Sequence, residues 1–479
     1  MRSRQAPLRP LGAASRWRAR TSVTPRRAAL AAALAAALLA PMSAQSAGLA
    51  EDLRDALAND PRWRSAQAAR DAGIEAEVQG RAGLLPQVSF TGSKSKASTD
   101  ATTQTAQGPQ DYSRDYDAFN YALQLRQPLL RPRAWAAYSQ GKAQAAYAEA
   151  NLRAARQDLA QRVVLAYAEW GYANASVQAS QSQVASLELS ASGARRVFEA
   201  GDGTRTDVET ARARLAQAQA QRVEAEGQVQ SAILGWRQLT GREALRTAPV
   251  IGTGSALRLP LDPATLAGWR DLALASNGQI QGLRHAVDAA RDEIRKTRSD
   301  HLPTLDLFAS RTRSQSDTEQ TIGNRYDTTR LGLQLSVPIY AGGSVSSTMR
   351  QAAAELRRAE SDLDAASQQL ALQVERDWHT LQSARETARA SMQSIDAAAL
   401  AARAARLGLA AGSATRIDEL DAIAQEAAAR RDLIQADARA LVAWARLMAA
   451  TDRLDEEALQ RADAVMEAVV VKVGGPPRN

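Results

Sequence analysis

The 479-residue chain contains no cysteine, and only 4% of its residues are aromatic. The lack of cysteine excludes a disulfide framework, thiolate metal sites and a lipid-modified N-terminal cysteine. Few aromatic residues and abundant alanine favour long helices that pack along thin seams over a globular core built around large rings.

Motifs for catalysis are lacking too. The three histidines, His285, His301 and His379, are scattered, and none stands four residues from another. The sequence contains no G-x-S-x-G, H-E-x-x-H or dinucleotide-binding pattern. We therefore expect no enzymatic activity, no bound metal and no cofactor.

The positive charge is confined to one end of the chain. The formal net charge is +8, from 60 Lys and Arg against 52 Asp and Glu. Residues 1–47 contain eight arginines and no acidic residue, so basic and acidic residues balance in the remainder. A neutral body argues against nucleic-acid binding driven by bulk charge.

Residues 1–47 have the layout of a secretory signal peptide. Arg26 and Arg27 precede thirteen residues of Ala and Leu over 28–40, and small residues follow Pro41. Thirteen residues fall short of the ~20 that a membrane-spanning helix needs. The alternatives are an anchor or an ordinary buried helix, but the pattern favours export by a signal peptide.

The rest of the chain is an internal repeat. Each half is predicted to contain a medium helix, two strands, a very long helix, a glycine-containing turn and a return helix. We expect a first repeat over 48–245, a linker over 246–262, a second repeat over 263–455 and a C-terminal tail over 456–479. The landmarks that recur, 208 to 217 residues apart, are Leu85-Pro86 and Leu302-Pro303, Gln127-Pro128 and Val337-Pro338, Gly201 and Gly412, Thr204 and Thr415, Asp207 and Asp418, Trp170 and Trp378, and Trp236 and Trp444.

Alternating apolar and polar residues predict the strands. Apolar residues occupy every second position over 119–125 and 331–337, and 87–96 and 304–315 are their weaker partners. The polar segments 97–115 and 316–326 are predicted to be exposed hairpin tips. Strands of ~10 residues suit a membrane barrel, but four strands cannot close one. Either the sheet packs on something else, or several copies of the chain share a barrel.

Heptad repeats predict the long helices. Val163, Trp170, Val177 and Val184 lie seven apart within 137–200. Met349, Leu356, Leu363 and Leu370 do the same within 344–411. Return helices are expected over 204–242 and 415–450. Medium helices over 51–83 and 264–300 would stack end to end on them, so that each half forms one long helix beside one composite helix.

The mature chain resembles the TolC-type outer-membrane efflux and secretion channels over nearly its whole length. The matching segments are Gly83-Leu84-Leu85-Pro86-Gln87, Gly201-x-x-Thr204-x-x-Asp207-Val208-x-x-Ala211, Val337-Pro338-Ile339-Tyr340-x-Gly342-Gly343 and Gly412-x-x-Thr415-x-x-Asp418-x-x-Asp421-Ala422.

The resemblance implies a mainly α fold with a membrane β-barrel. It implies a homotrimer in which each copy gives four strands to one 12-stranded barrel, continuous with an α-helical periplasmic tunnel. It also implies a place in the outer membrane of a Gram-negative bacterium, in contact with its lipid. The implied partners are a periplasmic adaptor and an inner-membrane ABC or proton-driven pump. The lack of an acylatable cysteine makes the type I secretion branch the better match.

The resemblance also places the closed end of the tunnel at the two helix turns, 201–207 and 412–418. It assigns the periplasmic aperture ring to Asp418 and Asp421, which lie three residues apart on one helix face. Three copies would form a ring of six carboxylates that favours cations. The alternative is local: Thr204 with Asp207, and Thr415 with Asp418, also fit capping boxes.

Other residues of the turns are expected to hold them closed. Related channels often carry a Tyr and an Arg where this chain has Leu409 and Ala414. We therefore expect Arg205 and Arg416 to substitute by pairing with Asp207. Gly201 and Gly412 are the turn glycines. The prolines where strands are expected to meet helices, as bends between barrel and tunnel, are Pro86, Pro128, Pro303 and Pro338.

The sequence thus predicts a passive conduit that carries proteins or small toxic molecules from an inner-membrane pump and its adaptor across the periplasm and outer membrane. A periplasmic coiled-coil scaffold without a pore is the alternative. The scaffold explains the heptads and the signal peptide, but it does not explain two pairs of alternating strands at matching positions.

Overall fold

The computed structural model describes residues 48–242, 248–316 and 325–473. The predicted signal peptide, part of the second hairpin tip and the end of the tail lie outside these residues. Within them, no helix is both long enough and apolar enough to cross a membrane.

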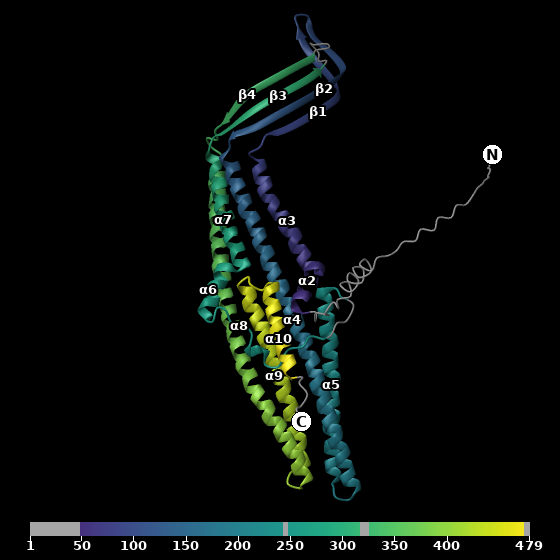
Figure 1. Cartoon of the computed structure of the whole chain (residues 1–479). Coiled ribbons are helices and arrows are strands. Elements are labelled where there is room, and N and C mark those ends of the chain that lie inside the picture. Colours follow the sequence, from purple (N-terminus) through teal and green to yellow (C-terminus); the bar gives the residue numbers. More distant parts are fainter. Residues whose placement is uncertain (1–47, 243–247, 317–324, 474–479) are drawn as a thin grey trace, which may run out of the picture. The chain divides into compact units, whose positions relative to one another are not determined.

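Two runs of elements follow each other in the same order, as the repeat predicts (Figure 1). The first run is α2 (Leu49–Asn59), α3 (Pro61–Ala82), β1 (Gln87–Thr105), β2 (Gly108–Leu130), α4 (Pro132–Glu199) and α5 (Arg205–Thr240). The second is α6 (Leu266–Ser276), α7 (Gly278–Arg298), the 3-10 turn η2 (Ser299–His301), β3 (Thr304–Ser316), β4 (Arg325–Ser336), α8 (Ser344–Ala410) and α9 (Arg416–Ala450).

Each predicted medium helix is in fact two helices, so the prediction of one continuous helix was wrong. In the first repeat the chain breaks at Asp60, whose side chain accepts a hydrogen bond from the Trp63 backbone N–H at 2.8 Å. Pro61 follows at the first helical position, where no N–H is needed. In the second repeat Asn277 caps α7 by accepting from the backbone N–H groups of Gln279 and Ile280. Both capping residues stop one helix and start the next.

The return helices and the second halves of the medium helices do meet end to end. At the end of α9, the Ala450 carbonyl accepts a hydrogen bond from the Asn277 amide at the start of α7, at 3.0 Å. At the end of α5, a Cβ on Gly241 would collide with the Asn59 side chain, just before α3. Each repeat therefore has a composite helix beside its long helix, as expected.

The four strands form one antiparallel sheet in the order β1-β2-β3-β4 (Figure 1). The first hairpin is longer than predicted. Strands β1 and β2 pair without interruption from Gln87 with Arg126 to Thr105 with Gly108, so most of the polar segment 97–115 is strand and not a loop. Its Ser and Thr residues lack apolar alternation, but a ladder of backbone hydrogen bonds does not require it.

The sheet has one apolar and one polar face, because directly paired residues share a face. Leu125 pairs with Val88 and Ala309, and Leu123 pairs with Phe90. Leu331, Leu333 and Leu335 continue the apolar face on β4; they and the paired residues Phe90 and Leu123 are exposed in the single chain.

Three of the four prolines lie at junctions between sheet and helices. Pro86 and Pro303 directly precede β1 and β3, and Pro338 follows β4. Pro128 was misplaced: it lies inside β2, where the register with β3 shifts between Pro128 and Leu130. A bulge tolerates a residue without an N–H.

The main apolar core lies where the linker and the tail meet the long helices. Trp269, Trp444 and Leu454 are fully buried there, together with Ala256 of the linker turn η1 (Ser255–Leu257). The first part of the predicted tail is helix α10 (Glu456–Val473). Its Asp463 side chain accepts a hydrogen bond from the Leu49 backbone N–H at 3.0 Å and so joins the two ends of the described chain.

Candidate functional site

The two helix turns predicted to close the tunnel have the same backbone geometry. Gly201 and Gly412 both have positive φ, 89° and 75°. The N–H of each next residue, Asp202 and Ser413, binds a carbonyl five residues back, at 3.1 and 2.8 Å. These are Schellman endings, which favour glycine because a Cβ is strained at positive φ.

Both threonines cap the helices that follow. The Thr204 hydroxyl accepts from the Asp207 backbone N–H at 3.1 Å. Thr415 and Asp418 form a complete capping box, in which the Thr415 backbone N–H also donates to Asp418 at 2.8 Å. The Thr415 hydroxyl bond, followed by this backbone bond, holds the pKa of the exposed Asp418 below its ordinary value. Asp418 is therefore a capping carboxylate that stays charged.

Asp421 has a partner that sequence reasoning missed. Arg214 of α5 donates to its carboxylate at 3.2 Å, and both side chains are about half exposed. The two residues are 207 positions apart, so no local pattern reveals the pair. This ion pair links the two return helices, α5 and α9, close to their turns.

Arg416 does not pair with Asp207, contrary to the expectation. Its guanidinium donates to Glu419 at 2.7 Å and to the Ser190 hydroxyl at 3.3 Å. The reason is local, because Arg416 and Glu419 are three apart on one helix face. Asp207 binds the Thr204 hydroxyl at 2.8 Å instead. Arg205 lies on the exposed side of α5 and lines a shallow hollow with Glu209 and Arg214.

Glu419 is the buried centre of this contact. It is only 4% exposed. Its carboxylate accepts from Ser190 of α4 at 2.8 Å, and Arg406 of α8 lies 3.7 Å away. Beside this contact, Val208 of α5 and Leu420 of α9 pack in an apolar cluster with residues of α4. Segments of α4, α5, α8 and α9 from the two repeats therefore meet here. Glu419 is thus positioned to hold the second turn against the first repeat. No motif marked it.

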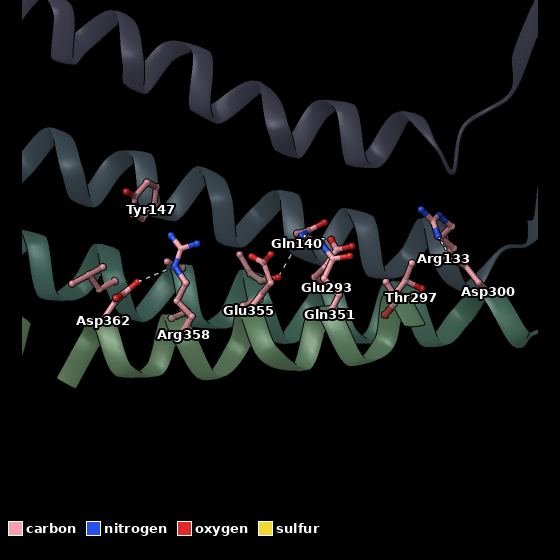
Figure 2. A pocket seen from close by; sticks show the side chains of 17 residues that line it. Arg133, Gln140, Tyr147, Glu293, Thr297, Asp300, Gln351, Glu355, Arg358 and Asp362 are labelled. Atoms are coloured by element: carbon pink, nitrogen blue, oxygen red, sulfur yellow. Dashed lines mark hydrogen bonds and ion pairs between the residues drawn. The ribbon is translucent and has the colours of Figure 1, made fainter. Parts of the chain in front are cut away.

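Further along the helices, α7 lies between α4 and α8 and leaves a hollow of about 730 Å³ (Figure 2). Charged and amide side chains from the three helices line it. Gln140 of α4 donates to Glu293 of α7 at 2.8 Å and accepts from Lys296 at 2.9 Å. Nearer the sheet, Arg133 binds Asp300. These polar contacts therefore connect the first and second repeats beside the hollow.

The corresponding joint on the other side of the first repeat is open. Helix α3 packs mainly against α4 and buries none of its own residues, whereas α7 packs on both α4 and α8 and buries Ile280 and Val287. Strands β1 and β4 are likewise the free edges of the sheet. Each open element corresponds to an element of the other repeat that is covered: β1 and α3 correspond to β3 and α7, and β4 corresponds to β2.

The chain was then compared with known proteins. The family model described as "Outer membrane efflux protein" matches residues 53–242 and 269–453. The chain is 35% identical over 414 residues to the alkaline protease secretion protein AprF of Pseudomonas aeruginosa, covering 86% of each protein. It is 34% identical over 436 residues to the proteases secretion protein PrtF of Dickeya chrysanthemi, covering 90% of this chain and 93% of that protein.

Solved structures have the same fold. The outer membrane protein VceC of Vibrio cholerae matches with a TM-score of 0.72 at 18% identity, covering 84% of this chain and 96% of that one. CusC, described as forming a transmembrane channel, also matches with a TM-score of 0.72 at 18% identity, covering 85% and 92%. The family match spans the two repeats, and the chain belongs to the outer membrane efflux protein family.

Proposed function

We propose that three copies of the chain form the outer-membrane channel of a tripartite export system of the type I secretion kind. The periplasmic adaptor and the inner-membrane pump supply the energy, and the channel is passive. Residues 1–47 direct export and are removed. The two protease secretion relatives support proteins as the cargo.

The observation that carries the proposal is that the sheet of one chain has two free edges, β1 and β4. A β1 edge and a β4 edge of neighbouring copies have unpaired backbone groups that need a partner. The helices are arranged in the same way. The side of α3 that is uncovered in one chain corresponds to a covered side of α7, and the uncovered side of α8 corresponds to a covered side of α4. Three copies give twelve strands, enough to close a barrel that four strands cannot close. The exposed apolar face of the sheet then meets lipid.

The aperture ring of this channel is proposed at the second turn. Asp418 and Asp421 from three copies would place six carboxylates around the axis. Asp418 remains charged because Thr415 binds its ionised form, and Asp421 is held by Arg214. Such a ring attracts cations and binds multivalent ones most strongly.

Single-channel conductance in a planar bilayer tests the proposal. The wild-type chain is expected to give a small cation-selective conductance that multivalent cations block from the periplasmic side. Asp418→Asn/Asp421→Asn is expected to relieve the block. A conducting channel that is indifferent to the double substitution would move the aperture elsewhere. Properly assembled protein without any conductance would overturn the channel and favour a scaffold.

A further inference from the structure

A group of basic side chains lies on the apolar face of the sheet, just beyond its apolar band. We call it the distal cationic patch, and it consists of Lys94, Arg311, Arg313 and Arg325 together with one carboxylate, Asp327. Arg313 pairs with Asp327, and Gln315 pairs with Arg325. Lys94 pairs with Phe119, which in turn pairs with Gln315. These side chains therefore share one face and neighbouring register rows.

The patch has more positive charge than its own carboxylate can match. Arg311 and Arg313 share Asp327: Arg311 donates to its two oxygens at 3.3 and 3.4 Å, and Arg313 donates at 3.2 Å. Both arginine side chains remain more than half exposed, at 69% and 55%. Arg325 donates only to the neutral Gln315 amide oxygen, at 3.3 and 3.4 Å, among the contacts of the described residues. The guanidinium groups therefore keep donors that point to solvent.

The position of the patch relative to the apolar band indicates what it meets. On β4 the apolar band runs from Leu335 to Leu331, roughly 13 Å along the strand at ~3.3 Å per residue. Arg311 stands in the next register row after Leu331, beside Leu123 of β2. The patch lies on the side of the hairpin tips, away from the helices.

We propose that the distal cationic patch binds the headgroup phosphates of an anionic glycolipid in the outer leaflet of the membrane. This inference rests on the proposed function, which places the apolar band in a bilayer and the helices in the periplasm. An occupant that satisfies both surfaces has acyl chains against Leu331 and phosphates that begin one row further out, at Arg311.

Arginine is suited to this role. Its planar guanidinium binds two phosphate oxygens at once, and it is more weakly hydrated than an ammonium group. Arg311 and Arg313 are next to each other on one face, so a single phosphorylated headgroup reaches both. Asp327 orients the two guanidinium groups and competes with the phosphate. The patch is therefore a headgroup site whose affinity the carboxylate limits.

The test uses the purified full chain in nanodiscs of phosphatidylcholine with diphosphoryl lipid A as a minor component. Native mass spectrometry counts the lipid A molecules retained per assembly. Wild type is expected to retain lipid A selectively over phosphatidylcholine. Arg311→Gln/Arg313→Gln is expected to lower this retention about tenfold or more, because charge-assisted hydrogen bonds are lost. Arg311→Lys/Arg313→Lys is expected to keep part of it.

Two controls separate binding from structure. Asp327→Asn breaks the same ion pairs but leaves the cations, so it is expected to retain lipid A as well as or better than wild type. Arg389→Gln removes an exposed charge from α8 and is expected to change nothing. Equal retention by wild type and the double Gln variant, with both inserted and conducting, would overturn the patch and leave the channel intact. A chain that never inserts into the bilayer would overturn the proposed function and the patch together.

Discussion

The two long helices, α4 and α8, have nearly the same length but very different surroundings. Helix α4 is packed among α3, α5, α7 and α9, and it has buried residues from Ala134 to Ala194. Helix α8 contacts α7 and α9 in its own repeat and has no buried residue between Ala352 and Val374. Its heptad residues Met349, Leu356 and Leu363 are only half-buried.

This difference supports the proposal that one chain is only part of a ring of copies. Because the sequence is duplicated, α4 and α8 have corresponding packing surfaces. Within one chain, only the packing surface of α4 is covered on both sides. Helix α8 lacks a neighbour in the place that α7 takes beside α4. In the repeat α3 corresponds to α7, so α3 of another copy is expected to fill that place. In the proposed trimer, association of copies would cover α8 as the fold of one chain covers α4.

The largest expected effect comes from linking the two free sheet edges. In the chain Gln124 of β2 pairs with Ser310 of β3. The repeat offsets of 210 and 217 residues carry this pair to Gln334 of β4 and Ser93 of β1 in a neighbouring copy. Because the chain has no cysteine, Ser93→Cys/Gln334→Cys should form disulfides only between copies, giving a covalent trimer in denaturing gels.

Geometry supports this prediction. Directly paired residues have Cβ atoms about 4.5–5.5 Å apart, close to disulfide geometry. Within one copy the two positions lie on opposite edges of the sheet, three strand spacings apart. The register also places Ser93 in the row of Tyr326, eight residues along β4 from Gln334, so the two positions are far beyond disulfide reach. The single variants Ser93→Cys and Gln334→Cys are the controls. Cross-linking that stops at dimers, or that equals the level of the single variants, would contradict the predicted edge pairing.

The next largest effect concerns the joint that the chain forms by itself. Glu419 binds Ser190 and Arg416 at this joint, while the matching position of the first repeat is the uncharged Val208. Glu419→Ala should destabilise the chain by about 3 kcal/mol, because it leaves a largely buried arginine unpaired. It should also raise the resting conductance, since the second turn is then less firmly held.

Asp421→Ala is the matched control for Glu419→Ala. It removes an ion pair with Arg214 that is half exposed, so the cost should be about 1 kcal/mol or less. Thermal unfolding in detergent, followed by helix circular dichroism, compares the two. Equal losses of stability would show that burial of Glu419 does not strengthen the joint.

The linker gives a pH-dependent prediction. Asp437 of α9 is fully buried and accepts from the backbone N–H groups of Gly254 and Ala256 at 2.8 and 2.9 Å. Burial outweighs these bonds and raises its pKa from 3.8 to about 6. The matching position of the first repeat is Val229, so the effect belongs to the second repeat alone.

The sign follows from proton binding. The folded chain holds the Asp437 proton more tightly than the unfolded chain, so this group favours folding most below about pH 4. That contribution is lost as the pH rises through about 6, and it amounts to about 3 kcal/mol. The stability difference between wild type and Asp437→Asn should therefore change by about this amount between pH 4 and pH 7.5. A difference independent of pH would contradict the raised pKa.

The smallest expected effect concerns the two helix turns, at which the two repeats have the same backbone geometry. Gly201→Ala and Gly412→Ala each place a Cβ at positive φ in otherwise open space, which should cost about 1 kcal/mol. Gly227→Ala, in the interior of α5 and also in open space, should instead stabilise the chain by up to about 1 kcal/mol. Unequal costs at the two turns, measured by thermal unfolding, would mean that the turns differ in a way their geometry does not reveal.

Sequence reasoning predicted the local features well. Caps, turn glycines and heptads depend on residues within one or two turns, so the order of elements and the roles of Thr204 and Thr415 as helix caps were correct. The helix breaks at Asp60 and Asn277 had local signals as well, in Asp60-Pro61 and Asn277-Gly278, which the prediction of continuous medium helices did not include.

The features that were missed depend on distant contacts. Asp421 meets Arg214 and Glu419 meets Ser190 across more than two hundred residues, and neither pair follows any spacing rule. The length of the first hairpin was missed for another reason: its Ser and Thr residues form strands without the apolar alternation on which the prediction relied.

The mass of the assembly tests the ring of three most directly. Native mass spectrometry of the detergent-purified mature chain should give three times the mass of one copy, without smaller species at equilibrium. A stable single copy that keeps its helix content, or a closed assembly with another number of copies, would contradict the interpretation that α3 and β1 of one copy complete α8 and β4 of the next.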